Sequence, residues 1–251
     1  MHQPELFDSP SDPQPGPMSG PITTTITTLS DQCVSRDDVL ALLQGAAGAP
    51  LCFERCDFEL QDLGQLALRQ ARFIDCQFAE ADFTRAQLQG SQWSGCRARQ
   101  ADFGLADLSD ARFVGCDLNN TEWGRAKLAS ASFVSVKLTG ARFADNSALG
   151  LGFRDTLLVA ATLRGFSFRK QRLEQIDFSE ADLSGSDFRE AVFEGGSLRD
   201  AHLKQARFEG ADLREVDLGG LQPANLALFK GATISVRQAV ALVAALGLQV
   251  A

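Results

Sequence analysis

A five-residue period dominates the sequence and leaves few folds open. Every fifth position from Phe53 to Leu218 is Phe, Leu or Trp, apart from Ala98 and Ala148. A period of five matches neither the 3.6-residue turn of a helix nor the two-residue alternation of a strand, so the backbone must turn once per unit. Repetition at a fixed period is typical of stacked repeat architectures. The period therefore predicts a solenoid.

The positions of the charged residues indicate which side chains face inward. Residues 51–220 contain 21 Lys and Arg and 26 Asp and Glu. None of them lies at a Phe/Leu centre or two residues before one, where small residues such as Ala prevail. Because an unpaired charge is very costly to bury, these two positions of each unit are predicted to line the interior.

A longer period gives the size of one coil. A column of cysteines recurs at every fourth unit and is continued by Val136 and Ile176: Cys56, Cys76, Cys96 and Cys116. Four units therefore make one coil, and the rise per coil should equal the spacing of hydrogen-bonded strands, about 4.8 Å. The 34 units predict 8.5 coils, which is a rod on the order of 40 Å long.

The cysteine column is not expected to bind metal. Parallel thiols in one column cannot surround an ion tetrahedrally, and the chain has only two histidines, His2 and His202. Cysteine also behaves as a small buried hydrophobic residue. We therefore predict a packing role, with no metal site and no cofactor.

The repeat unit itself resembles a known family. Units such as ARFID at 71–75 and ADFTR at 81–85 follow the pattern A-(D/x)-(F/L)-x-x. In this pattern the chain resembles the pentapeptide-repeat family over roughly two thirds of its length. The resemblance implies an all-β solenoid, a right-handed quadrilateral β-helix with short capping helices at both ends.

One stretch departs from the pattern, residues 146–170. Asn146, Leu151 and Phe166 occupy sites meant for small residues, and Ala148 underfills a centre. We expect a bulge or a short loop there.

Four segments follow from these patterns. Residues 1–30 form a leader rich in Pro and Thr that is predicted to be disordered, either a plain extension or an uncleaved secretion signal. Residues 31–50 hold a short capping helix that Ser35 and Asp38 open and Gly45 ends. Residues 51–220 are the solenoid, and residues 221–251 form the C-terminal cap and helix.

The C-terminal helix has more apolar surface than a cap needs. Ser235 is its predicted N-cap, Gln238 follows three residues later, and Gly247 ends it. In the quinolone-resistance branch of the family a similar helix joins two rods, so the resemblance implies a homodimer. The residues predicted to cap or dimerise are Val236, Ala239, Val240, Leu242, Val243 and Leu246.

Charge and motif content exclude several classes of function. The net charge of −8 argues against binding to nucleic acid or an anionic membrane. No catalytic residues are predicted, so we expect that the protein is not an enzyme. There is no apolar run of about 18 residues and no secretory signal, which favours a cytoplasmic protein. The leader leaves a secreted effector as the alternative.

Charge is uneven among the four faces of the predicted solenoid. Summed over every fourth unit, the face that contains Phe58 totals −4, two faces total −1 each and the fourth totals +1. The first of these is either a solvated surface or a partner-binding strip, interrupted by Arg97, Arg99 and Lys137. Its predicted binding residues are Asp57, Glu59, Glu80, Asp117, Asp177, Glu180 and Asp217.

The resemblance also implies a function. Rods of this family imitate duplex DNA and occupy the DNA-binding saddle of DNA gyrase or topoisomerase IV, which protects these enzymes from quinolones or peptide toxins. Duplex DNA 40 Å long holds about 24 negative charges, whereas residues 51–220 total −5. Shape would therefore matter more than charge. The alternative is a protein–protein scaffold or a secreted bacterial effector.

Overall fold

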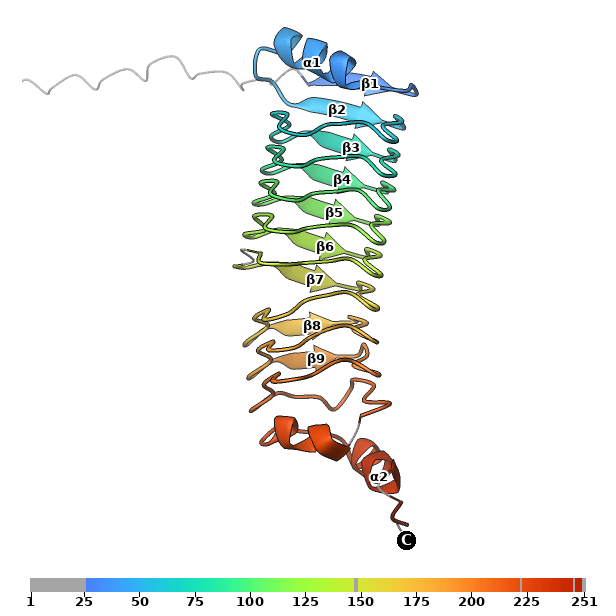
Figure 1. Ribbon diagram of the computed structural model, residues 1–251, viewed down its shortest axis with the longest axis vertical. Helices are drawn as coiled ribbons and strands as arrows, with labels where there is room; N and C mark the ends of the chain where they lie inside the picture. The colour runs from blue at the N-terminus through green and yellow to red at the C-terminus, as the bar shows by residue number, and fades with distance from the viewer. Residues whose placement is uncertain (1–25, 147–148, 222, 246, 250–251) are drawn as a thin grey trace, which may run out of the picture.

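The protein forms a tall solenoid whose coils stack along one axis (Figure 1). The computed structural model describes residues 26–146, 149–221, 223–245 and 247–249. One face is a parallel sheet in which nine strands lie in sequence order. The strands are β1 (Thr27–Ser30), β2 (Leu51–Glu54), β3 (Arg72–Ile74), β4 (Gln92–Ser94), β5 (Arg112–Val114), β6 (Ser132–Val134), β7 (Gly152–Arg154), β8 (Arg172–Glu174) and β9 (Val192–Glu194).

Each coil contains four repeat units, one on each face. Along the sheet, Phe73 pairs with Trp93, and Trp93 pairs with Phe113. The other three faces are joined by single bridges at the same interval, namely Asp57 to Gln77, Asp62 to Asp82, and Ala67 to Gln87. We call the sheet face 1, and the faces with centres at Phe58, Leu63 and Leu68 faces 2, 3 and 4. The predicted four-sided solenoid is confirmed.

The repeat motif supplies the corners of the coil. The last residue of a unit adopts a positive φ, as at Arg55 (51°), Leu60 (60°) and Gly115 (63°), a conformation that turns the chain sharply. The Asp that precedes many centres stabilises the turn. Asp82 Oδ1, for example, accepts the backbone N–H of Thr84 at 2.6 Å, which is the Asx-turn geometry. The D of the A-D-(F/L) pattern is therefore a turn residue.

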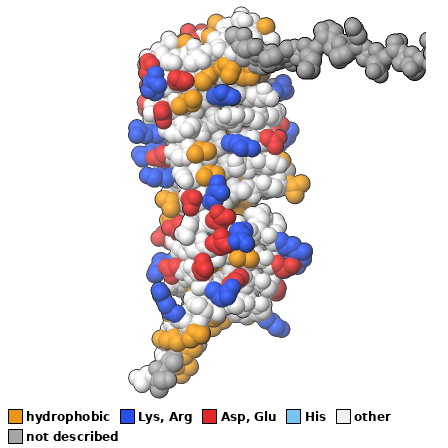
Figure 2. All heavy atoms as spheres, turned by 180° about the vertical axis from the view of Figure 1, so that it is seen from behind, with side chains coloured by type: hydrophobic (Ala, Val, Ile, Leu, Met, Phe, Trp, Pro, Cys, Tyr) orange, Lys and Arg blue, Asp and Glu red, His pale blue; other side chains and the backbone are white. Residues whose placement is uncertain are grey.

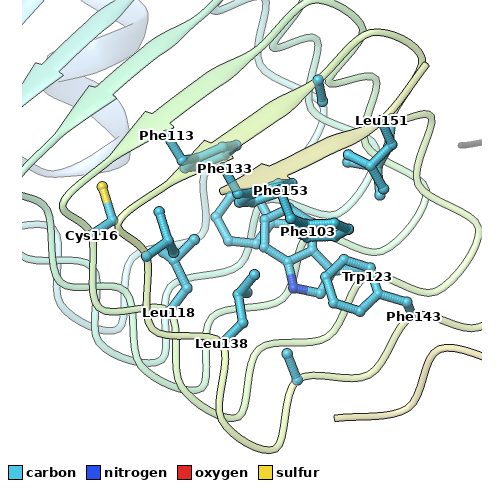
Figure 3. Packing of buried hydrophobic residues seen from close by; sticks show 14 of the residues in the cluster. Phe103, Phe113, Cys116, Leu118, Trp123, Phe133, Leu138, Phe143, Leu151 and Phe153 are labelled. Atoms are coloured by element: carbon cyan, nitrogen blue, oxygen red, sulfur yellow. The ribbon is translucent and has the colours of Figure 1, made fainter. Parts of the chain in front are cut away.

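The centres and their small partners fill the interior, as predicted. Every described centre is buried, and the rings of successive coils stack (Figure 3). On face 1 the ring centroids of Phe113 and Phe133 are 4.8 Å apart, and those of Phe133 and Phe153 are 5.3 Å apart. The Trp123 indole also donates its N–H to Thr121 Oγ1 at 2.8 Å.

The N-terminal end is sealed by a strand as well as a helix. The helix α1 (Arg36–Gly45) begins at Ser35, whose side chain forms a capping box with Asp38, and it buries Val39. Residues 27–30 pair in parallel with β2 as strand β1. The leader was predicted to include these four residues, and the structure corrects that boundary. Their β-branched threonines suit a strand, and pairing satisfies the backbone edge of β2. Residues 1–25 lie outside the described residues.

The irregular stretch keeps the register of the solenoid. Ser132 pairs with Gly152, and Arg142 bridges Thr162, so each step still equals four repeat units. The expected bulge is thus not an insertion, although residues 147–148 themselves lie outside the described part. The Asn146 amide instead donates to the carbonyl oxygens of Trp123 at 2.6 Å and Ala126 at 3.3 Å.

The C-terminal end carries two short helical segments, the 3₁₀ helix η1 (Pro223–Phe229) and the helix α2 (Val236–Ala245). Between them, Thr233 bridges Asp212 and extends the ladder of the solenoid. Ser235 and Gln238 form the predicted cap, with Ser235 N–H donating to Gln238 Oε1 at 2.6 Å. Gln238 also donates to the carbonyl oxygens of Leu213 and Val216, both at 2.7 Å, which ties α2 to the last coil.

Candidate partner-binding surfaces

Four of the seven acids predicted to bind a partner are turn residues of face 2. Each accepts the backbone N–H two residues later, at distances between 2.9 and 3.4 Å: Asp57, Asp117, Asp177 and Asp217. Two of them also form ion pairs across coils, because Arg99 and Arg199 lie 2.7 Å from Asp117 and Asp217. Asp117 and Asp217 are therefore neutralised within the protein.

The other three predicted acids are exposed but not contiguous. Glu59 and Glu80 lie on adjacent coils, whereas Glu180 is five coils beyond Glu80. Between them, Arg97 and Lys137 lie in the same column as Asp117. Face 2 thus carries acids near its two ends and cations in its middle, as its sequence indicates, and the partner-binding role of the seven acids stays a prediction.

Face 3 contains a continuous column of acidic residues. The summed charge of the whole face does not reveal this column. Successive bridges join Asp62 to Asp82, Asp82 to Asp102, and Asp102 to Glu122. We call these four residues the carboxylate ladder. The face totals −1 because Arg and Lys occupy its other positions. Charges summed by column instead of by face would have revealed the ladder from sequence alone.

The middle of the ladder is open to a partner. Its two ends are neutralised, since Arg36 lies 2.9 Å from Asp62 and Arg142 lies 2.7 Å from Glu122. Asp82 and Asp102 have no ion pair among the described residues. The residue after each neighbouring centre is small, as at Gly104, where a Cβ would lie 2.8 Å from Asp102 Oδ1. A broad surface can therefore approach these carboxylates.

The helix α2 leaves its apolar side chains largely uncovered. None of its described residues is buried, and Val236 and Val240 are 82% and 42% exposed. Ala239, Leu242 and Val243 are half-buried, and Leu246 lies outside the described residues. Apolar side chains cover the tapered C-terminal end in Figure 2. Two of the six residues predicted to cap or dimerise are therefore exposed, and their role in a dimer stays a prediction.

The cysteine column is a packing feature. Cys52, Cys56, Cys76, Cys96 and Cys116 are buried and unpaired. The thiols of Cys76 and Cys96 donate to the carbonyl oxygens of Phe53 and Phe73, each at 3.3 Å. Hydrogen bonding to Cys116 and Cys76, together with burial, raises the pKa of the Cys96 thiol. A protonated, buried thiol is a poor nucleophile.

The described residues contain no cluster of three or more His, Cys, Asp or Glu that could hold a metal ion. Nor does any described helix have the length and apolar character needed to cross a membrane.

The fold and its surfaces define a class, that of repeat solenoids with a closed core and four outward faces. Within it, the chain belongs to the pentapeptide-repeat family. A "pentapeptide repeat region" model matches residues 51–123, and "pentapeptide repeats" models of eight and nine copies match 106–145 and 168–220. Residues 146–167 are matched by none of these models, in agreement with the irregular stretch. No curated protein matches the chain.

A solved structure shows the same fold at low sequence identity. A trypsin-treated variant of QnrB1, a plasmid-mediated fluoroquinolone resistance protein, is 21% identical with a TM-score of 0.51, over 90% of this chain and 99% of QnrB1. HetL, a pentapeptide-repeat protein involved in heterocyst differentiation regulation in the cyanobacterium Nostoc, is also 21% identical, with a TM-score of 0.37 over 78% of this chain and 89% of HetL.

Proposed function

We propose that the protein is a non-enzymatic interaction protein that binds the DNA-binding surface of a bacterial type II topoisomerase, DNA gyrase or topoisomerase IV. The carboxylate ladder on face 3 is the observation that carries this proposal. Its four acids follow one another at the coil spacing, about 4.8 Å, while one DNA strand carries a phosphate for about every 3.4 Å of helix axis. A basic surface that binds phosphates accepts such a row of carboxylates.

The proposal moves the expected contact surface from face 2 to face 3. Asp82 and Asp102, in the open middle of the ladder, are the proposed contact residues. The summed charge of each face had instead predicted the seven acids of face 2. Support also comes from the shared fold with QnrB1, whose recorded role is fluoroquinolone resistance. The ladder is short, so shape must still contribute most of the complementarity.

Inhibition of purified gyrase supercoiling tests this proposal. The double variant Asp82→Asn, Asp102→Asn removes two charges but keeps an amide oxygen that can accept the turn hydrogen bond. Loss of two exposed ion pairs should weaken inhibition roughly two- to thirty-fold. The matched control, Asp57→Asn with Asp177→Asn, removes two turn acids from face 2 and should inhibit like the wild type.

Two results would contradict the proposal. A wild-type protein without effect at micromolar concentration, with or without a quinolone, would reject topoisomerase binding. Equal inhibition by the wild type and the ladder variant would reject the ladder as the contact surface.

The same proposal includes a homodimer formed through α2, supported by the exposure of Val236 and Val240. Replacing both by Glu should convert a dimer to a monomer in multi-angle light scattering. Leu60, which is 67% exposed on face 2, provides the control, and Leu60→Glu should leave the mass unchanged. A monomeric wild type would reject the dimer.

A scaffold that binds another protein partner through its faces is the second candidate. It is favoured by exposed apolar side chains on faces 1 and 2, since Leu60, Val114 and Leu157 are 67%, 48% and 40% exposed. Under both proposals we place the protein in the cytoplasm, and a secreted effector is the alternative. If the protein is a secreted effector, removal of residues 1–25 should abolish its export. If it binds a topoisomerase, the same removal should leave inhibition of that enzyme intact.

A further inference from the structure

A groove runs along the corner between faces 1 and 2, in the coils of β4 to β6. Three successive corner residues have small side chains or none: Gly95, Gly115 and Ser135. They line a hollow of about 550 Å³. Other coils place larger residues at this corner, such as Arg55 and Asp75.

The backbone does not require these small corners. Arg55 and Asp75 adopt the same positive φ, 51° and 54°, as Gly95 and Gly115 at 65° and 63°. A Cβ on Gly115 would have no other atom within 4 Å. A Cβ on Gly95 would instead meet the carboxylate of Asp75, so only Gly115 leaves surface space without relieving a clash, which favours a bound segment as its reason.

The groove is cationic, although the protein as a whole is acidic. Arg97, Arg99 and Lys137 line it, and its only lining acid, Asp117, lies 2.7 Å from Arg99. Arg97 and Lys137 have no ion pair among the described residues. They lie two coils apart in one column, a separation of about 9.6 Å.

An apolar border runs along the opposite side of the groove. Val114 and Val134 come directly before the corner residues Gly115 and Ser135, and Val114 is 48% exposed. The occupant should therefore be an extended peptide with two carboxylates about 9.6 Å apart and apolar side chains between them.

We propose that this groove binds residues 4–10 of the same chain, PELFDSP. Glu5 and Asp8 are three residues apart and flank Leu6 and Phe7, and the first 25 residues contain no Lys or Arg. Six of those residues are proline, and proline-rich chains favour the polyproline II conformation. In that conformation residues three apart share one side, about 9.3 Å from each other, which matches Arg97 and Lys137.

Chain length permits this contact. Seventeen residues separate Asp8 from Ile26, and they can span about 56–60 Å. The groove lies three to five coils from β1, about 14–24 Å along the axis. A tether of this kind gives a local concentration in the millimolar range, so a weak site is filled by the chain's own segment before it is filled by a dilute partner. The segment thereby covers part of faces 1 and 2.

Amide NMR spectra of the full-length chain test the contact from both sides. Glu5→Gln with Asp8→Asn should shift the amide signals of Gly95, Gly115 and Ser135. Arg97→Glu with Lys137→Glu should in turn shift those of Leu6 and Phe7, and chymotrypsin should then cleave faster after Phe7. Loss of two exposed ion pairs should reduce the equilibrium constant for docking roughly two- to thirty-fold.

The control variant removes two exposed cations from face 3, Arg85→Glu with Lys204→Glu, and should leave the Leu6 and Phe7 signals unchanged. Combining Glu5→Lys and Asp8→Lys with the groove reversal should restore the docked signals. The proposal is overturned if the corner amides are identical in the wild type and in the Glu5→Gln, Asp8→Asn variant. It is also overturned if the face 3 control shifts the leader signals as much as the groove variant does. Neither result depends on topoisomerase binding.

Discussion

The coils before Asn146 and those after Phe166 stack their aromatic rings on different faces of the solenoid. Before Asn146, aromatic rings stack on faces 1 and 3, as in Phe103 on Trp123 with centroids 4.4 Å apart. After Phe166 the longest stack is on face 4. There Phe188 lies 4.9 Å from both Phe168 and Phe208, while face 3 continues with leucines such as Leu183.

The repeat determines the register of the coils but not the face on which the aromatic rings stack. The register of four units per coil is the same in both regions, so the backbone does not depend on which face carries the rings. Where the rings change face, the strand pairing is locally reduced. Pairing of β7 with β8 is reduced to Arg154 with Glu174, and Phe166 occupies the small-residue site that Ala126 and Ala106 hold in coils nearer the N-terminus.

The largest effect is expected from a charge in the regular stack. Phe113 is fully buried between Trp93 and Phe133, at centroid distances of 5.3 and 4.8 Å. Phe113→Asp should destabilise the protein by roughly 4–5 kcal/mol or more, because no partner for the carboxylate is in reach. The variant should lose its β-sheet circular dichroism. Phe113→Leu, which places the other common centre residue there, should still fold, and an unchanged melting point for the Asp variant would refute the inward assignment.

Truncation of one ring in each region compares the two packing schemes directly. Phe133→Ala removes a ring stacked on both sides and should cost about 3–5 kcal/mol. Phe166→Ala should cost less than about 2 kcal/mol, because Phe166 borders a surface hollow and other coils accept alanine there. Urea denaturation measures both values. Equal losses would show that the irregular coil is packed as tightly as the regular ones.

A smaller effect is expected where the regular region buries a polar group. Thr121 is buried and accepts the indole N–H of Trp123. Thr121→Val should cost about 1–3 kcal/mol, since it leaves that donor unsatisfied. Adding Trp123→Phe removes the donor, so the double variant should recover part of the loss in a double-mutant cycle. A Thr121→Val protein as stable as the wild type would show that the hydrogen bond contributes nothing.

Much of the fold was predictable because inward positions exclude charge. The rule assigned Phe113 and Ala111 correctly, and the cysteine column gave the four-unit coil that the pairing of Trp93 with Phe113 confirms. Strand β1 was missed because Thr27–Ser30 lie outside the repeat and belong to the sheet only through pairing with β2. No local pattern distinguishes such a strand from a polar leader.

The candidate surfaces were less predictable because charge alone does not reveal what each acid does. The carboxylate of Asp177, which stays a predicted binding residue, also accepts the backbone N–H and the hydroxyl of Ser179. The carboxylate ladder and the small corners at Gly95 and Gly115 depend on alignment across coils. This alignment can be found from the sequence by comparing residues that occupy the same position in every fourth unit.

The region after Phe166 should be the more sensitive to acid, because it relies on a well-buried ion-paired carboxylate. Asp187 lies 2.7 Å from Arg189 and 2.9 Å from Arg207, with 12% of its side chain exposed. The hydrogen bond from Arg189 lowers the pKa of Asp187 from 3.8 to about 2. Its folded-state pKa is below the unfolded value, so this stabilisation is complete above pH 3.8 and is lost as the pH falls toward 2. Urea denaturation across that window should show a loss of about 1–2 kcal/mol in the wild type. The Asp187→Asn variant should be less stable than the wild type at neutral pH, and its free energy of unfolding should not show this loss on acidification. Identical pH profiles of the wild type and the variant would show that the ion pairs of Asp187 do not stabilise these coils.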